Sequence, residues 1–110
     1  MRDKDTALLE NEVAVDLHDR FGEGLFFLKS PKNRIDVDFY VPEEGLAVQV
    51  AYSVAGQARA REVDSLVRFA RVQDGMRRLL IVTKQEEETI EEDGVTIEVV
   101  PAWKWLLREV

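Results

Sequence analysis

Two short apolar segments joined by four turn residues constrain the fold of this chain more than any other feature. Residues 35–41 (IDVDFYV) alternate between apolar and polar side chains, the period of a strand with one face buried. Residues 46–52 (LAVQVAY) are again typical of a strand. The connector PEEG is too short for a crossover between parallel strands, so the pattern predicts an antiparallel hairpin.

Alternation also predicts which side chains of the hairpin share a face. Asp36, Asp38 and Tyr40 should point one way, and the apolar side chains of the same strand the other way. That apolar face consists of Ile35, Val37, Phe39 and Val41. On the second strand, Ala47, Gln49 and Ala51 should share a face, opposite Val48 and Val50.

The remaining periodicity predicts further helices and strands around the hairpin. Residues 6–20 and 58–72 show helical spacing, and a last helix begins at Pro101. Strands are expected at 25–29, which we expect to be buried, at 78–83 and at 95–100. The order is α-β-β-β-α-β-β-α, which predicts an α/β fold, a mixed sheet flanked by helices on both faces. We expect residues 1–110 to form a single domain.

The composition excludes several classes of site. The chain has 110 residues and no cysteine, so disulfides and thiolate metal sites are impossible. No apolar run reaches membrane-spanning length, and residues 1–10 lack the apolar core of a signal peptide, so we expect a cytoplasmic protein. A net charge of −7 argues against a dedicated nucleic-acid binder, which usually carries excess lysine and arginine.

The charge is distributed unevenly along the chain. Residues 85–93 (QEEETIEED) are strongly acidic, and we interpret them as a solvated loop. Residues 59–78 are rich in arginine, which we interpret as a solvated helix face. The expected partners of these arginines are Glu62, Asp64 and Asp74.

One glutamate of the first helix falls on its inner face. Glu10 shares a helical stripe with Ala14, Leu17 and Phe21, whereas Glu12 should be solvated. A buried carboxylate needs a partner or a metal, because an unpaired buried charge is costly. Glu10 is therefore a candidate site residue.

Several stretches together resemble the PD-(D/E)XK, or restriction-endonuclease-like, superfamily. They are ALLENEV, IDVDFYV and GLAVQVAYS, in that order. With LLIVTKQEE and DGVTIEVVPAWKWLL, the chain more specifically resembles a C-terminal domain of uncharacterised function that follows a AAA-type P-loop ATPase module in archaeal and bacterial proteins. The resemblance implies a restriction-endonuclease-like sheet, and an ATPase module as partner in cis or in trans.

The resemblance also assigns positions to the site. Glu10 matches the helix glutamate of the superfamily and Asp38 its strand aspartate. Gln49 and Ala51 stand where the family has the Glu and Lys of its Glu-x-Lys pair. Mg²⁺ prefers anionic oxygen ligands, and the lysine would orient the attacking water and stabilise the phosphorane. We therefore expect a vestigial site that binds Mg²⁺ weakly through Glu10, Asp38 and Gln49 and has no catalytic residue.

A basic residue from elsewhere could replace the missing lysine. Lys29 lies on the neighbouring predicted strand, and Arg59 and Arg61 begin the second helix. Arginine is a poor base because it stays charged, so ion pairing of Arg59 or Arg61 with Asp38 or Glu10 is the favoured interpretation.

Three functions follow from these observations. The favoured one is a non-catalytic accessory or interaction domain of an ATPase, and the alternative is a metal-dependent DNA nuclease with a displaced basic residue. A third is DNA binding without cleavage through the face formed by residues 59–78. Trp103 and Trp105 cannot share one helix face, so one should pack on the sheet and the other is a candidate docking anchor. His18, near a helix end, should be a surface residue.

Overall fold

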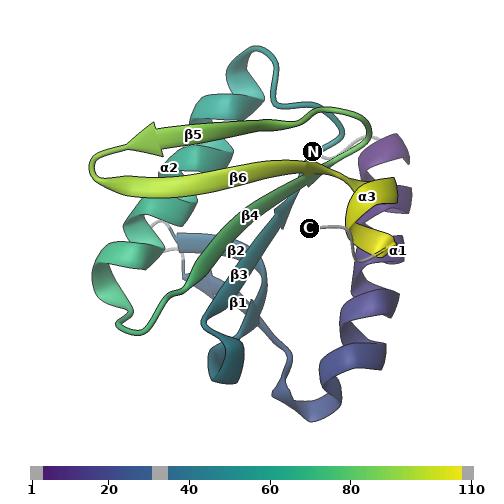
Figure 1. Ribbon diagram of the computed structural model, residues 1–110, viewed down its shortest axis with the longest axis horizontal. Coiled ribbons are helices and arrows are strands. Elements are labelled where there is room, and N and C mark those ends of the chain that lie inside the picture. Colours follow the sequence, from purple (N-terminus) through teal and green to yellow (C-terminus); the bar gives the residue numbers. More distant parts are fainter. Residues whose placement is uncertain (1–3, 31–34, 108–110) are drawn as a thin grey trace.

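A six-stranded mixed sheet with helices on both faces forms the domain (Figure 1). The computed structural model describes residues 4–30 and 35–107, without the side chains of Lys29, Ser30 and Ile35. The helices are α1 (Lys4–Phe21), α2 (Gln57–Val72) and α3 (Ala102–Leu106). The strands are β1 (Phe26–Ser30), β2 (Ile35–Val41), β3 (Leu46–Val50), β4 (Arg78–Thr83), β5 (Glu88–Glu92) and β6 (Val95–Pro101).

The strand order in the sheet is β1-β2-β3-β4-β6-β5. Strands β1, β2 and β3 pair antiparallel, which confirms the predicted hairpin between β2 and β3. Helix α2 then crosses over, so that β4 pairs parallel with β3, and β6 pairs parallel with β4. The predicted mixed sheet with helices on both faces is therefore confirmed.

Strand β5 was not predicted, because the acidic run that contains it was interpreted as a solvated loop. Residues Glu88–Glu92 pair antiparallel with β6 through a turn in which Asp93 and Gly94 both have positive φ. Ile90 is the one buried residue of β5, and its carboxylates are exposed at the sheet edge. A single inward-facing apolar residue gives almost no alternation, so the strand pattern is hidden by the charge.

The predicted strand at residues 25–29 is confirmed by β1, but the expectation that it is buried was wrong. Strand β1 is the other edge of the sheet, where Phe26 is 50 % and Phe27 66 % exposed. The ring of Phe27 nevertheless contacts Phe39, with ring centroids 5.5 Å apart. An apolar segment can therefore lie at an edge and keep part of its surface in solvent.

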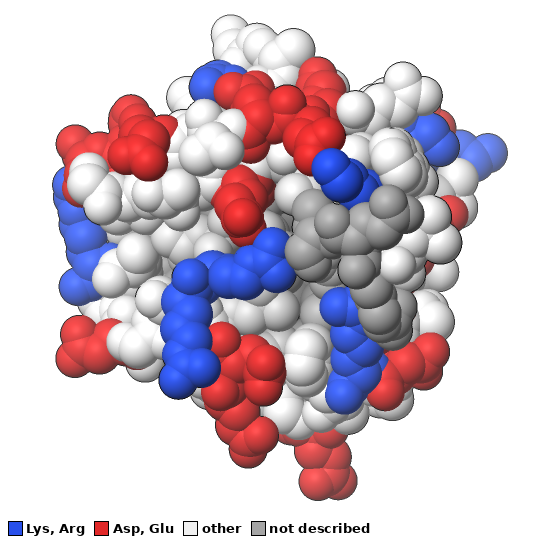
Figure 2. Space-filling model, in the orientation of Figure 1, with Lys and Arg blue, Asp and Glu red and all other residues white. Residues whose placement is uncertain are grey.

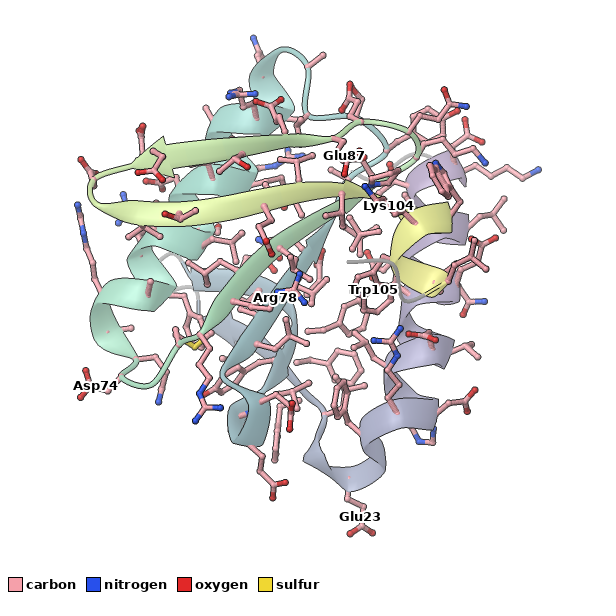
Figure 3. All side chains as sticks on the ribbon, viewed as in Figure 1. Glu23, Asp74, Arg78, Glu87, Lys104 and Trp105 are labelled. Carbon is pink, nitrogen blue, oxygen red and sulfur yellow. The ribbon has the colours of Figure 1, made fainter. Side chains whose placement is uncertain are left out.

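Two apolar clusters lie on opposite faces of the sheet. On one face, α1 contributes Leu9, Val13 and Leu17, and α3 contributes Trp105. Arg20 of α1 stacks 4.6 Å from the centroid of the Trp105 ring and donates to the Trp105 carbonyl, and so fixes α3 beside α1 (Figures 1 and 3). On the other face, α2 packs through residues that include Val63, Leu66, Val67 and Phe69.

Gly45 joins two turns at the end of the sheet where β3 and β4 begin. Its φ of 61° lies in the left-handed region, and its carbonyl accepts hydrogen bonds from Arg77 N at 2.7 Å and Arg78 N at 3.0 Å. A Cβ atom at this position would lie 2.3 Å from the carbonyl oxygen of Gly75. Only glycine satisfies both the backbone conformation and the close approach.

Candidate functional site

The strand β2 carries an extra residue at the position of the predicted aspartate. Phe26 of β1 lies opposite Tyr40, but Leu28 lies opposite Val37, so two steps along β1 match three along β2. This is a β-bulge at Asp38 and Phe39, which reverses the inward and outward alternation locally. Val37 and Tyr40 consequently belong to the cluster under α2, and Phe39 to the cluster under α1.

The bulge corrects the predicted faces of this strand. Strict alternation would have placed Val37 with Phe39, and Asp38 with Tyr40. The structure instead buries Asp38, which is 5 % exposed, and leaves Asp36 exposed. The extra residue lies between Val37 and Tyr40, so the apolar side chains of this strand are divided between the two faces of the sheet.

Side chains replace the backbone ladder where β2 and β3 separate. Ladder pairing between the two strands runs over Phe39–Val48, Tyr40–Ala47 and Val41–Leu46. Beyond it, the Gln49 Oε1 accepts from Asp38 N at 2.7 Å, and its Nε2 donates to the Asp36 carbonyl at 2.6 Å. In return, Val50 N donates to the Asp38 Oδ2 at 2.8 Å. We call these three hydrogen bonds the Asp38–Gln49 clasp.

The clasp explains why an amide is suitable at residue 49. An amide offers one acceptor and one pair of donors, so it can meet both the N–H and the C=O that β2 presents to it. The side chain thereby takes the place of a peptide group from a neighbouring strand. At 2 % exposed, Gln49 is buried, and a carboxylate there would face the Asp36 carbonyl without a proton to share.

The structure brings together two of the four residues of the predicted vestigial site. Asp38 and Gln49 are in direct contact through the clasp. Ala51 is buried in the cluster under α2, whereas Glu10 is half-buried on α1, which packs on the other face of the sheet. The convergence of Glu10 with Asp38 remains a prediction, as does weak Mg²⁺ binding through Glu10, Asp38 and Gln49.

The two arginines expected to pair with Asp38 or Glu10 have other partners. Arg59 makes a bidentate pair with Glu88 of β5, with both N–O distances 2.9 Å. The strand β5, which was missed in the sequence, supplies this acid. Arg61 lies 3.5 Å from Glu62. The side chain of Lys29 is outside the described residues, although its backbone pairs opposite Asp36.

The contact between Arg59 and Glu88 shifts the pKa of both groups. Its hydrogen bond with Arg59 lowers the pKa of the Glu88 carboxyl below its ordinary value. The same hydrogen bond raises the pKa of Arg59. Both groups are substantially exposed, so the pair orders the surface between α2 and β5 more than it stabilises the fold.

Acids and bases elsewhere are interspersed. Arg68 pairs with Asp64 at 2.7 Å, as predicted for the arginine-rich helix. Glu62, expected on a solvated face, is buried on α2, since its helix position faces the sheet. Figure 2 shows red and blue side chains interspersed over the face that it draws, without one continuous basic patch on that face. DNA binding through the face formed by residues 59–78 remains a prediction.

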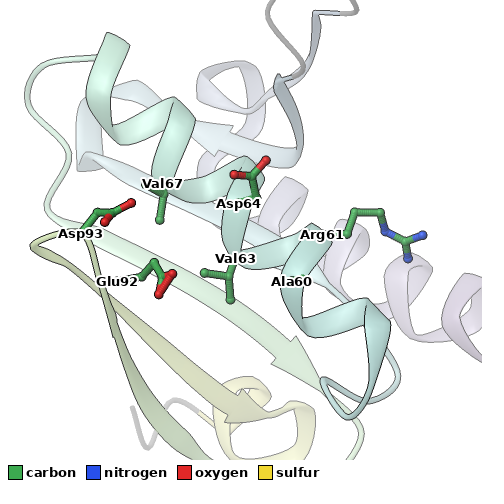
Figure 4. Close-up of a pocket in the computed structure, with 7 residues that line it drawn as sticks. All are labelled: Ala60, Arg61, Val63, Asp64, Val67, Glu92 and Asp93. Carbon is green, nitrogen blue, oxygen red and sulfur yellow. The ribbon is translucent and has the colours of Figure 1, made fainter.

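A surface pocket lies between α2 and the turn after β5, with a volume of about 470 Å³ (Figure 4). Its apolar floor comes from Val63 and Val67, and its rim carries Asp64, Glu92 and Asp93. Asp64 pairs with Arg68, and Asp93 pairs with Arg71 at 2.9 Å. Two of the three rim carboxylates are therefore already neutralised within the fold.

Polar groups also gather where the parallel strands β3, β4 and β6 end, and the sequence analysis did not identify them. Glu86 accepts from Ser53 Oγ at 2.8 Å and from Val54 N at 2.6 Å, and so holds the loop after β3. Thr83, fully buried, hydrogen-bonds both the N–H and the carbonyl of Glu86. The signal was available, because ligands of α/β sheets commonly bind at the carboxyl ends of parallel strands.

The prediction that the two tryptophans differ is confirmed. Trp105 is buried against the sheet, whereas Trp103 is 55 % exposed. Trp103 is therefore the candidate docking anchor of the pair. His18 is exposed near the end of α1, as expected.

Comparisons with protein-family models, with curated proteins and with solved structures gave no significant match. Within residues 4–30 and 35–107, the structure has no group of three or more His, Cys, Asp or Glu side chains placed to hold a metal ion. Across the same residues, none of the helices combines the length and the apolar character that crossing a membrane requires.

Proposed function

We propose that this chain is a non-catalytic interaction domain with a restriction-endonuclease-like fold and a closed, degenerate site. The observation that carries the proposal is the Asp38–Gln49 clasp. Both polar atoms of the Gln49 amide bond the backbone of β2, and the Asp38 carboxylate bonds the backbone of β3. The groups that a nuclease would direct at a metal are used here to hold two strands together.

The chemistry of the neighbouring positions supports the same conclusion. Ala51 offers no group that could orient a water molecule, and it is buried in the core. Arg59, one candidate for a displaced base, is engaged with Glu88 and stays protonated. Hydrolysis of a phosphodiester needs a metal-bound or base-activated water, and these residues supply neither.

The topology supports the fold assignment within this proposal. An antiparallel hairpin, β2–β3, leads through α2 to a parallel neighbour, β4, and the separated ends of the hairpin carry Asp38 and Gln49. The resemblance noted in the sequence makes an ATPase with a P-loop module the proposed partner, in cis or in trans. The function of the domain would then be to connect that module to other molecules.

A cleavage assay tests the absence of catalysis. The protein is incubated with single-stranded and double-stranded DNA in millimolar Mg²⁺ or Mn²⁺, beside the Asp38→Ala variant. We expect the same background for both proteins. Cleavage by the wild type that disappears in Asp38→Ala would favour the alternative, a metal-dependent nuclease with a displaced basic residue such as Lys29.

A further inference from the structure

Three neighbouring chain segments meet in one row at the carboxyl ends of the parallel strands. The Lys84 N–H donates to the Tyr52 carbonyl at 3.1 Å, which extends the pairing of β3 with β4. Thr83 pairs with Pro101 at the end of the parallel ladder, and Lys84 and Ala102 are the residues that follow this pair. Tyr52, Lys84 and Ala102 therefore span about 10 Å, two strand spacings, and Trp103 is the next residue.

This row exposes the side chains that protein interfaces favour. Tyr52 is 41 % exposed, and Trp103 is more exposed still. Tyrosine and tryptophan are enriched at interfaces, because they bury a large apolar area at a low cost in conformational entropy. Tyr52 and Trp103 are therefore anchor candidates at the carboxyl edge of the sheet.

The charges around the row indicate what kind of partner it fits. The Glu86 carboxylate keeps its charge and accepts hydrogen bonds from Ser53 Oγ and Val54 N, which hold it against the loop after β3. Glu87 pairs with Lys104 at 2.6 Å, which joins the start of α3 to the loop after β4 (Figure 3). The exposed ammonium of Lys84 makes no hydrogen bond or ion pair with the rest of the described chain.

Local charge outweighs net charge at such a surface, because charges are screened beyond about 8 Å at physiological salt. The net charge of −7 therefore does not prevent Lys84 from attracting an acid that comes within a few ångströms. Aromatic surface beside a cation with no partner matches a segment with an acidic and an apolar side chain.

We propose that the row formed by Tyr52, Lys84 and Trp103 docks a protein segment that presents a carboxylate to Lys84 and an apolar side chain to the aromatic rings. The inference rests on the proposed role as an interaction domain, and it names the surface and the chemistry of the partner. It uses neither the Asp38–Gln49 clasp nor the pocket beside α2.

Peptide titrations observed by NMR test this surface. The probes are a six-residue synthetic peptide of alternating phenylalanine and glutamate, and its counterpart with lysine in place of glutamate. We expect the glutamate peptide to cause saturable shifts at the amides of Tyr52 and Lys84 and at the indole N–H of Trp103. The lysine peptide should bind more weakly.

Charge reversal and truncation sharpen the test. Lys84→Glu should lower the affinity for the glutamate peptide by about fivefold, the scale of one exposed ion pair, and should reverse the preference between the two peptides. Trp103→Ala should lower the affinity for the glutamate peptide by about tenfold, as truncation of an interface anchor does. Val72→Ala, at an exposed apolar position at the end of α2, is the matched control and should change nothing.

Two results would overturn the inference. One is the absence of saturable shifts at these three residues with either peptide at millimolar concentration. The other is a peptide preference that Lys84→Glu leaves unchanged. Either result would leave the proposal of a non-catalytic domain intact, because the DNA cleavage assay tests that proposal separately.

Discussion

Replacing Gln49 by alanine should destabilise the domain strongly, because the side chain of Gln49 bonds the backbone of β2. The variant loses hydrogen bonds of 2.7 and 2.6 Å to the backbone of β2. The N–H of Asp38 is then left buried without this acceptor, whereas the Asp36 carbonyl lies nearer to water, because Asp36 is exposed. An unsatisfied buried group costs about 1–3 kcal/mol.

The smaller loss at Asp36 and the cavity left by the side chain add to this cost. We therefore expect the free energy of unfolding to fall by about 2–4 kcal/mol in total. Urea denaturation followed by tryptophan fluorescence measures it, with Trp105 as the buried reporter. Gln85→Ala, at an exposed position, is the control and should stay within about 0.5 kcal/mol of the wild type. A Gln49→Ala loss no larger than that of the control would refute the clasp as a structural element.

The Gln49→Glu variant tests the same geometry by its pH dependence. A protonated glutamate can still donate to the Asp36 carbonyl and accept from Asp38 N, whereas the carboxylate cannot donate. Its pKa in the folded state should therefore rise above the unfolded value of about 4.3. The stability that the protonated side chain gives the folded variant is present below the unfolded pKa and is lost as pH rises through the folded pKa. A variant whose stability increases over that range would contradict the reasoning.

Two further predictions concern the rest of the fold. Gly45→Ala combines a positive φ with a Cβ atom 2.3 Å from the Gly75 carbonyl, so it should cost about 2–4 kcal/mol in urea denaturation, whereas Gly22→Ala, also at positive φ but with open space around it, should cost about 1 kcal/mol. Because the pKa of Glu88 is lowered, the stability that its ion pair with Arg59 contributes is present above the unfolded pKa and is lost as pH falls through the folded pKa. An NMR titration of the Glu88 carboxyl should show an ordinary pKa in the Arg59→Ala variant. An unchanged low pKa in that variant would contradict the assigned cause.

The sequence predicts most of the backbone of this domain, because the elements in question carry strong periodicity. The strands Ile35–Val41 and Arg78–Thr83 match their predicted limits, and α2 begins one residue earlier than expected. The strand β5 was missed because its side chains are almost all polar, as is common at a sheet edge that must not pair further. Alternation and charge gave opposite signals there, and charge was given too much weight.

The site was harder to predict than the fold. Alternation correctly put Ala47 of β3 and Ala51, the residue after β3, on one face of the sheet, both under α2. It could not anticipate the bulge at Asp38 and Phe39, because an extra residue in a strand depends on pairing with β1, which is a tertiary contact. The partner of Arg59 depended in turn on β5, so one missed strand changed the predicted electrostatics of the site.

The response of the Asp38 and Val50 backbone amides to Mg²⁺ is the most direct measurement of the central claim, that the clasp closes the site. In an NMR titration to about 10 mM Mg²⁺, the account predicts no saturable shift at either amide, because the Asp38 carboxylate and the Gln49 amide are already bonded to backbone. Saturable shifts at both amides, absent from the Asp38→Ala variant, would show that the site still binds a metal and would contradict the account.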